Sequence, residues 1–190
     1  RVSTGGGEQT YDFAITGDGS FTPAAYTYQL PLQFCGYDRS EILTNFPVLV
    51  VLGPGSIPGF SYGQLASPSG GDLRFSDSGQ TQLLNFEIES WDTGGNSYVW
   101  VQVPALSGTN TSIYAYWGNT NAATLPAYTT NGAAWSERYA GVWHLAETAG
   151  SSRDATTNGL SGYASNDVTQ IAGGQIGGGE NHLLLRFVHG

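Results

Sequence analysis

Alternation between apolar and polar positions is most regular from Leu84 to Pro104, where it predicts a β-hairpin with two unlike faces. The expected core face carries Phe86, Ile88, Val99, Val101 and Val103. The opposite face carries Glu87, Glu89, Trp91, Tyr98, Trp100 and Gln102. A Gly- and Asn-rich turn, residues 92–97, joins the two strands and suits a hairpin. This turn would pair Trp91 with Tyr98, Glu89 with Trp100, and Glu87 with Gln102.

Further short apolar runs predict more strands. Residues 26–37 and 112–119 alternate well enough for strands, and residues 43–52 are apolar on both faces, which is typical of a central strand. No segment keeps a helical period for more than two turns. The pattern predicts an all-β fold, a β-sandwich with jelly-roll-like connections, plus an extra fragment of a second β domain.

The composition narrows the possible partners. With 15 acidic residues, only six basic ones and a net charge of −9, the chain has no electrostatic basis for nucleic-acid binding. No apolar run reaches the ~20 residues that cross a bilayer, so membrane insertion is not expected. The one cysteine, Cys35, lies in an apolar run and is expected to be a buried thiol. We expect the chain to be a mature or excised piece of a longer exported protein, located outside the cell or on its surface.

Composition changes along the chain suggest four parts. We expect an N-terminal arm with one short strand over residues 1–24, a β-sandwich over residues 25–121, a connector over residues 122–138, and a further segment over residues 139–190. We expect residues 139–190 to be a partial second domain. Such a truncated domain could leave an open strand edge and promote self-association of the protein.

Several motifs also carry family resemblances. The series LTNFPVLVVL, GGDLRFSDSG, LNFEIESWDTGGNSYVWVQVPAL and IYAYWGN, within about residues 26–121, resembles a bacterial domain of unknown function, number 2341. The following AGVWHLAETAG and DATTNG resemble the start of a concanavalin A-like, laminin-G-type lectin domain. These resemblances imply an exported, β-rich protein in a polysaccharide or cell-surface context. They supply no catalytic residues.

The polar-aromatic face of the hairpin is the leading candidate ligand site, with Trp91, Tyr98, Trp100, Glu87, Glu89 and Gln102 as its members. Flat rings stack on sugar C–H faces, while carboxylate and amide oxygens accept bonds from hydroxyl groups. The alternative is that the face lies under the N-terminal arm or the second sheet, with the aromatic rings in a core and the Glu side chains reaching its rim.

Glu87 and Glu89 also allow a glycoside hydrolase hypothesis. Residues two apart on a strand lie about 6.5–7 Å from each other. Their carboxyl groups could therefore approach the separations of retaining or inverting enzymes. If the chain is an enzyme, these are the predicted catalytic acids.

No metal or redox cofactor is predicted, apart from a possible structural calcium. Weak candidate ligands are the loop residues Asp72, Asp77 and Asp92, with Asp154 and Asp167 further on. Turn capping is the simpler role for such residues. The three histidines, His144 among them, are far apart in the sequence, and Trp143 and His144 are expected to alternate on a strand that packs in a core.

Together these patterns predict a secreted, non-catalytic carbohydrate-binding module that recognises polysaccharide. A structural or adhesive spacer of a large surface protein is the first alternative, and a glycoside hydrolase is the second. A glycan panel with and without calcium, combined with a reducing-sugar assay, would separate the three.

Overall fold

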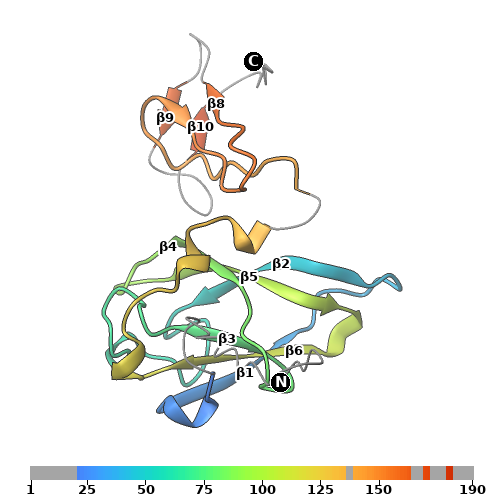
Figure 1. Cartoon of the computed structure of the whole chain (residues 1–190), viewed down its shortest axis with the longest axis vertical. Helices are drawn as coiled ribbons and strands as arrows, with labels where there is room; N and C mark the ends of the chain where they lie inside the picture. Colours follow the sequence, from blue (N-terminus) through green and yellow to red (C-terminus); the bar gives the residue numbers. More distant parts are fainter. Residues whose placement is uncertain (1–20, 136–138, 164–168, 172–178, 182–190) are drawn as a thin grey trace, which may run out of the picture.

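Two three-stranded antiparallel sheets face each other in the computed structural model, which describes residues 21–135, 139–163, 169–171 and 179–181 (Figure 1). The first sheet has the order β1 (Tyr28–Phe34), β6 (Thr111–Trp117), β3 (Arg74–Asp77). The second has the order β2 (Leu43–Leu52), β5 (Ser97–Leu106), β4 (Phe86–Ser90). The predicted all-β sandwich is confirmed, whereas the jelly-roll-like connections stay a prediction.

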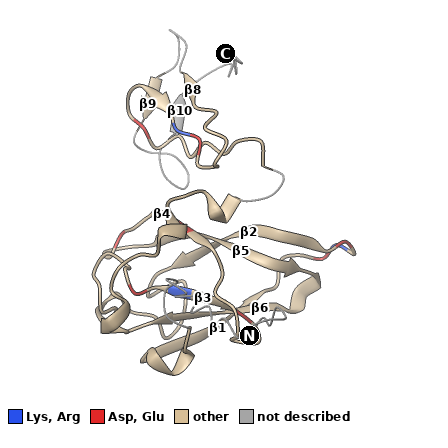
Figure 2. Ribbon diagram, in the orientation of Figure 1, with Lys and Arg blue, Asp and Glu red and all other residues tan. Residues whose placement is uncertain are grey.

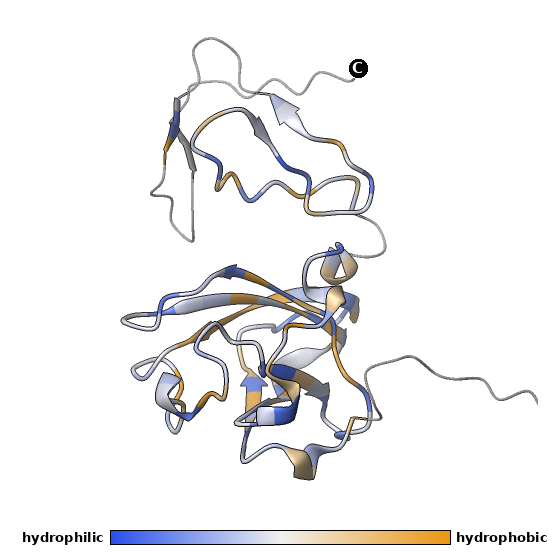
Figure 3. Cartoon of the chain, turned by 60° about the vertical axis from the view of Figure 1, so that its left-hand side comes forward, coloured by the Kyte–Doolittle hydropathy of each residue, from blue (hydrophilic) through white to orange (hydrophobic). Residues whose placement is uncertain are grey.

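Both sheets contribute to one apolar core, because each strand turns alternate side chains inward. Phe75 of β3 and Phe86 of β4 are fully buried and meet edge to face, with ring centroids 5.2 Å apart. Val99 and Val101 of β5 and Ile113 of β6 complete the centre of this core. Figure 3 shows hydrophobic residues along the strands of both sheets. Burial of these side chains is the main stabilisation of the sandwich.

Short elements complete the described chain. The helices are three-residue 3₁₀ turns: η1 (Pro23–Ala25), η2 (Tyr62–Gln64), η3 (Gly108–Asn110), η4 (Thr120–Ala122), η5 (Ala127–Thr129) and η6 (Ala133–Trp135). The later strands form two small pairs: β7 (Ser151–Ser152) with β8 (Gly162–Tyr163), and β9 (Thr169–Ile171) with β10 (Gly179–Asn181). Within the described ranges, no helix is long and apolar enough to span a membrane.

Strand β2 occupies the predicted residues 43–52 but not the predicted place. It ends the sheet order, and β5 is the central strand, so the expectation of a central β2 is wrong. Pro47 lies within β2 and has no N–H to donate to a second neighbour, which suits a strand at the edge of its sheet. The apolar residues on both faces of β2 therefore do not indicate a neighbour on both sides.

Cys35 also differs from expectation, because its thiol is exposed. Strand β1 ends one residue earlier, at Phe34, so Cys35 belongs to the following loop rather than to the core-facing strand. The strand predicted within the N-terminal arm, at residues 11–15, lies outside the described residues.

Candidate functional site

A β-bulge in β4 changes the register predicted for the hairpin. Glu87 pairs with Trp100 and Ile88 with Val99, but Ser90 pairs with Tyr98, so Glu89 is the extra residue. The predicted pairs Trp91–Tyr98, Glu89–Trp100 and Glu87–Gln102 are therefore wrong. A bulge reverses the alternation of the residues that follow it. This reversal separates Trp91 from the other predicted site residues.

Trp91 packs on the core side of the sandwich. Its ring meets Tyr62 edge to face at 5.5 Å, and its indole N–H donates to the carbonyl of Pro68 at 2.8 Å. It also contacts the main apolar core. Trp91 thus fastens the long loop of residues 53–71 and does not share a surface with Trp100.

The remaining predicted residues do share the outer face of β4 and β5. The indole N–H of Trp100 donates to Glu89 Oε2 at 3.0 Å. Gln102 is buried and joins two neighbours: its Oε1 accepts from Asn85 at 3.2 Å, and its Nε2 donates to the carbonyl of Ala134 at 3.4 Å. Tyr98 is half-buried at the far end of this face, opposite Val51 of β2.

Residues after the sandwich cover this outer face. Trp135 of η6 is 7% exposed and donates its indole N–H to Glu87 Oε2 at 2.5 Å. Its ring contacts Trp100, Tyr139 and His144, with centroids 5.4, 5.7 and 5.5 Å away. Trp135, Trp100 and Tyr139 belong to a second, smaller apolar cluster outside the sandwich core. Trp100 therefore packs in a small core, but the cover is the segment after the sandwich and not the N-terminal arm or second sheet of the alternative interpretation.

His144 sits between the two carboxylates. Its Nδ1 contacts Glu89 Oε2, and its Nε2 lies 3.4 Å from Glu87 Oε1. The side chains of His144, Glu87 and Glu89 are 18%, 14% and 4% exposed. The 3.4 Å contact is an ion pair rather than a well-formed hydrogen bond, because His144 Nε2 has no hydrogen-bond partner of good geometry.

Contacts at this site shift the pKa of His144 and that of Glu89. Burial acts to lower the pKa of His144, but its close contacts with the charged Glu87 and Glu89 outweigh burial and raise this pKa from 6.5 to about 9. Burial acts to raise the pKa of Glu89, yet its bonds with His144 and Trp100 hold that pKa below the usual 4.5. At neutral pH the site therefore contains an imidazolium held by carboxylates.

A cavity of about 190 Å³ opens beside these groups, at the junction of the sandwich with the later segment. It is lined by Glu87, Ile88, Glu89, His144, Ala146, Glu147, Arg153 and Ala155. One buried oxygen of Glu147 has no protein partner, while its other oxygen accepts from the amide of Arg153 at 2.9 Å. The lining thus offers charged groups of both signs.

The arrangement does not suit the predicted acid–base pair of a glycosidase. A general acid of that class needs a carboxyl group whose pKa is raised, so that it holds a proton at working pH. Glu89 is shifted in the opposite direction, and both carboxylates already accept bonds from an indole and contact the imidazole of His144.

The candidate calcium ligands serve the backbone instead. Asp72 is fully buried, and its carboxylate accepts the amide N–H groups of Ala66, Ser67, Gly118 and Asn119 at 2.9, 2.9, 2.6 and 3.3 Å. Asp77 accepts from Thr81 and Gln82, which lowers its pKa against the opposing effect of burial. Asp92 accepts from the Gly94 amide. Within the described part of the chain, no group of three or more His, Cys, Asp or Glu residues is arranged to hold a metal ion.

Asp154 has the same role in the later segment. It is 5% exposed and accepts from the amides of Val142, Thr156 and Leu160, each at 2.9 Å. The backbone of Trp143 makes an isolated bridge with Asp154, so the strand predicted for Trp143 and His144 does not form. This carboxylate fixes the loop that presents His144. Asp167 lies outside the described residues.

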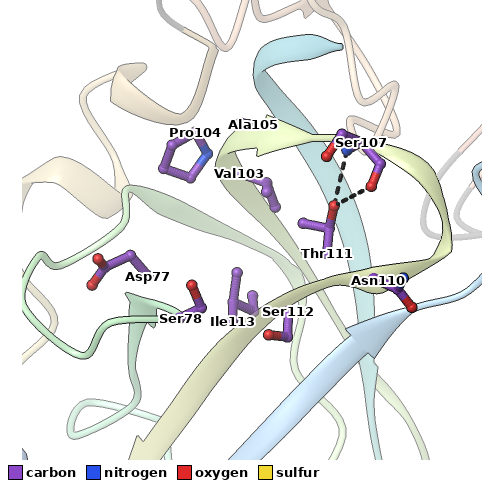
Figure 4. A pocket seen from close by; sticks show the side chains of 10 residues that line it. All are labelled: Asp77, Ser78, Val103, Pro104, Ala105, Ser107, Asn110, Thr111, Ser112 and Ile113. Atoms are coloured by element: carbon purple, nitrogen blue, oxygen red, sulfur yellow. Dashed lines mark hydrogen bonds between the residues drawn. The ribbon is translucent and has the colours of Figure 1, made fainter. Parts of the chain in front are cut away.

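A larger pocket, of about 300 Å³, lies between the end of β5 and strands β3 and β6 (Figure 4). The Thr111 hydroxyl donates to the carbonyl of Ser107 and accepts from its amide, at 3.0 and 2.9 Å. The carboxylate of Asp77 is already held by its own turn. The lining contains no aromatic side chain and none of the predicted glycan-binding residues.

These features define an all-β sandwich whose polar sheet face is occupied by later parts of its own chain. Residues 69–143 match the family described as Domain of unknown function (DUF2341). The matched stretch includes β4, β5 and Trp135 and stops one residue before His144. No curated protein and no solved structure matches the chain. The lectin-like resemblance of the later residues stays a prediction.

Trp135 and the role of His144 were missed by the sequence reasoning. Trp135 lay in a stretch interpreted as a connector because its neighbours are small and polar. One signal was present: a tryptophan is costly to leave in water, so an isolated one in a small-residue segment indicates a buried contact.

Proposed function

We propose that this chain is a non-catalytic structural module of a larger protein, whose β4–β5 face anchors the segment that follows the sandwich. The observation that supports this most directly is the imidazole of His144 between Glu87 and Glu89. The ion pairs join residues 55 or more positions apart in sequence, and the carboxylates come from β4 whereas the imidazole comes from the later segment.

Burial of the pairing groups supports anchoring over incidental contact. An exposed ion pair contributes little to stability, because water screens the charges. Here Glu89 is 4% exposed, and the ring of Trp135 covers the imidazole from one side. Removing one partner would leave a buried, uncompensated charge, which is strongly unfavourable.

The same geometry argues against polysaccharide binding on this face as the main role. A sugar-binding surface needs exposed rings and free hydrogen-bonding groups. The indole N–H groups of Trp100 and Trp135 already donate to Glu89 and Glu87. Gln102 is buried beneath η6. The first alternative from the sequence, a structural spacer, therefore fits the structure better.

The wider setting belongs to the same proposal. We place the protein outside the cell or on its surface, with the segment after Trp143 as the start of a lectin-like domain. The resemblances in the sequence and the low content of basic residues support this setting, and the few charged groups are scattered along the described ribbon (Figure 2). In this arrangement the sandwich gives the next domain a fixed orientation.

Polysaccharide recognition is the second candidate, favoured by the cavity of about 190 Å³ at the junction. Its carboxylates and the guanidinium of Arg153 are groups that bind sugar hydroxyls. Affinity electrophoresis on soluble polysaccharides, with a reducing-sugar assay on the same samples, tests this candidate. Retardation that disappears in Arg153→Ala would support it, and no retardation with any glycan would exclude it.

The anchoring role is tested by hydrogen exchange, measured by mass spectrometry, in the double variant Glu87→Gln/Glu89→Gln. We expect the amides of residues 139–163 to exchange faster while the strands of the sandwich remain protected. Glu41→Gln is the matched control, because Glu41 is an exposed glutamate in the loop between β1 and β2. Equal protection of residues 139–163 in both variants would show that the face does not anchor them.

A further inference from the structure

One ionisable group decides the charge balance at the junction. Two buried carboxylates on β4 face a single imidazole, with one indole N–H for each carboxylate. A protonated His144 presents an N–H to each glutamate. A neutral imidazole has only one N–H, and its charge is gone. Two carboxylates would then share a site of low exposure without a cation between them.

From this geometry we infer that His144 is a pH-dependent latch, which holds residues 139–163 on the sandwich near neutral pH and releases them in alkaline solution. This inference rests on the proposed function, since it names what controls the same junction. The latch is an intramolecular contact, so its release would expose the face that carries Trp100 and Trp135.

Other charged and titratable groups also face the junction. Arg153 and Glu147 line the cavity beside His144. Tyr139 meets Trp135 edge to face, and burial raises the pKa of its hydroxyl above 10. From β5 and η6 the facing groups are indoles, which do not titrate. His144 is the facing group that loses its proton between pH 6.5 and 10.

The direction of the effect follows from linkage. The pKa of His144 is about 9 in the closed state and close to 6.5 once the segment has left. Protonation therefore favours the closed state fully below pH 6.5, and this advantage is lost as the pH rises through 9. Between pH 7 and pH 10 the ratio of open to closed molecules should rise by up to about a hundredfold.

Fluorine NMR of the whole chain, labelled with 5-fluorotryptophan, tests the latch. The resonance of Trp135 is assigned by its loss in Trp135→Phe, and its exposure is measured by the solvent-induced isotope shift. We expect it to be buried at pH 7 and to become exposed between pH 8 and 9.5 in the wild type. In His144→Gln the exposure should not depend on pH, and Glu41→Gln should behave as the wild type.

Each result has a separate meaning. A Trp135 resonance that is exposed already at pH 7 would overturn the anchoring function itself. A resonance that is buried equally at pH 7 and 9.5 would leave the anchoring function in place and overturn the latch. A transition of the same midpoint in His144→Gln would assign the pH dependence to another group and also overturn the latch.

Discussion

The Glu89–His144 pair can be measured as a coupling free energy with the variants Glu89→Gln, His144→Gln and the double variant. The rise in the His144 pKa from 6.5 to about 9 corresponds to about 3 kcal/mol of preference for the protonated form. Two carboxylates share this effect, and Glu89 is the more buried partner. We therefore expect a coupling of about 1–2 kcal/mol between Glu89 and His144.

The assay is urea unfolding at pH 6, followed at the fluorine resonance of Trp135, which lies beside the pair. At this pH His144 is protonated in the folded state and largely so in the unfolded state, so the coupling is fully expressed. Each single variant should lower the free energy of unfolding, and the double variant should lose less than the sum of the two.

The corresponding cycle between Glu41 and His144 is the control, with an expected coupling of zero, because Glu41 is exposed and does not line the cavity at the junction. A Glu89–His144 coupling below about 0.5 kcal/mol, the usual limit of additivity, would refute the reasoning. It would mean that water replaces the lost partner, and that the pair does not hold the later segment.

Three further predictions concern single side chains. In Asp72→Asn the carboxamide cannot accept all four backbone N–H groups, so the free energy of unfolding should fall by about 2–4 kcal/mol. Because Asp72 binds backbone amides, thermal unfolding of the wild type should not respond to a chelator. In Gly70→Ala the new Cβ would lie 2.8 Å from the ring of Trp91, at a φ of +75°. The free energy of unfolding in urea should therefore fall by about 1–3 kcal/mol. An unchanged unfolding midpoint would contradict the placement of that ring. Trp135→Phe keeps a ring but removes the N–H donated to Glu87, which should cost about 1–3 kcal/mol in the same assay, and no loss would show that this bond is not formed.

The strands were the most predictable part of the molecule. Residues 43–52 form β2 with the predicted bounds, and the predicted strand at residues 112–119 appears as Thr111–Trp117. Period-two alternation predicts which side chains of a strand point inward, and the side-chain directions in the tertiary structure follow it. The valines of β5 and Phe86 accordingly lie in the predicted core.

Pairing was less predictable, because register depends on more than alternation. The bulge at Glu89 has no marker in the sequence that distinguishes it from a regular strand position, yet it moves Trp91 to the opposite side of the sheet. The place of β2 at a sheet edge likewise depends on which strands it meets, and its apolar pattern could not report that.

By itself, the sequence determined that this chain is an all-β sandwich and that one sheet face brings carboxylates and aromatic rings together. Alternation and composition act over a few residues, so they can be read without knowing the fold. Only the tertiary structure decided that the face is covered, since Trp135 and His144 reach Glu87 and Glu89 from 48 and 55 or more positions away. Contacts over such separations depend on how loops return to the sheet, and residue spacing carries no information about that path.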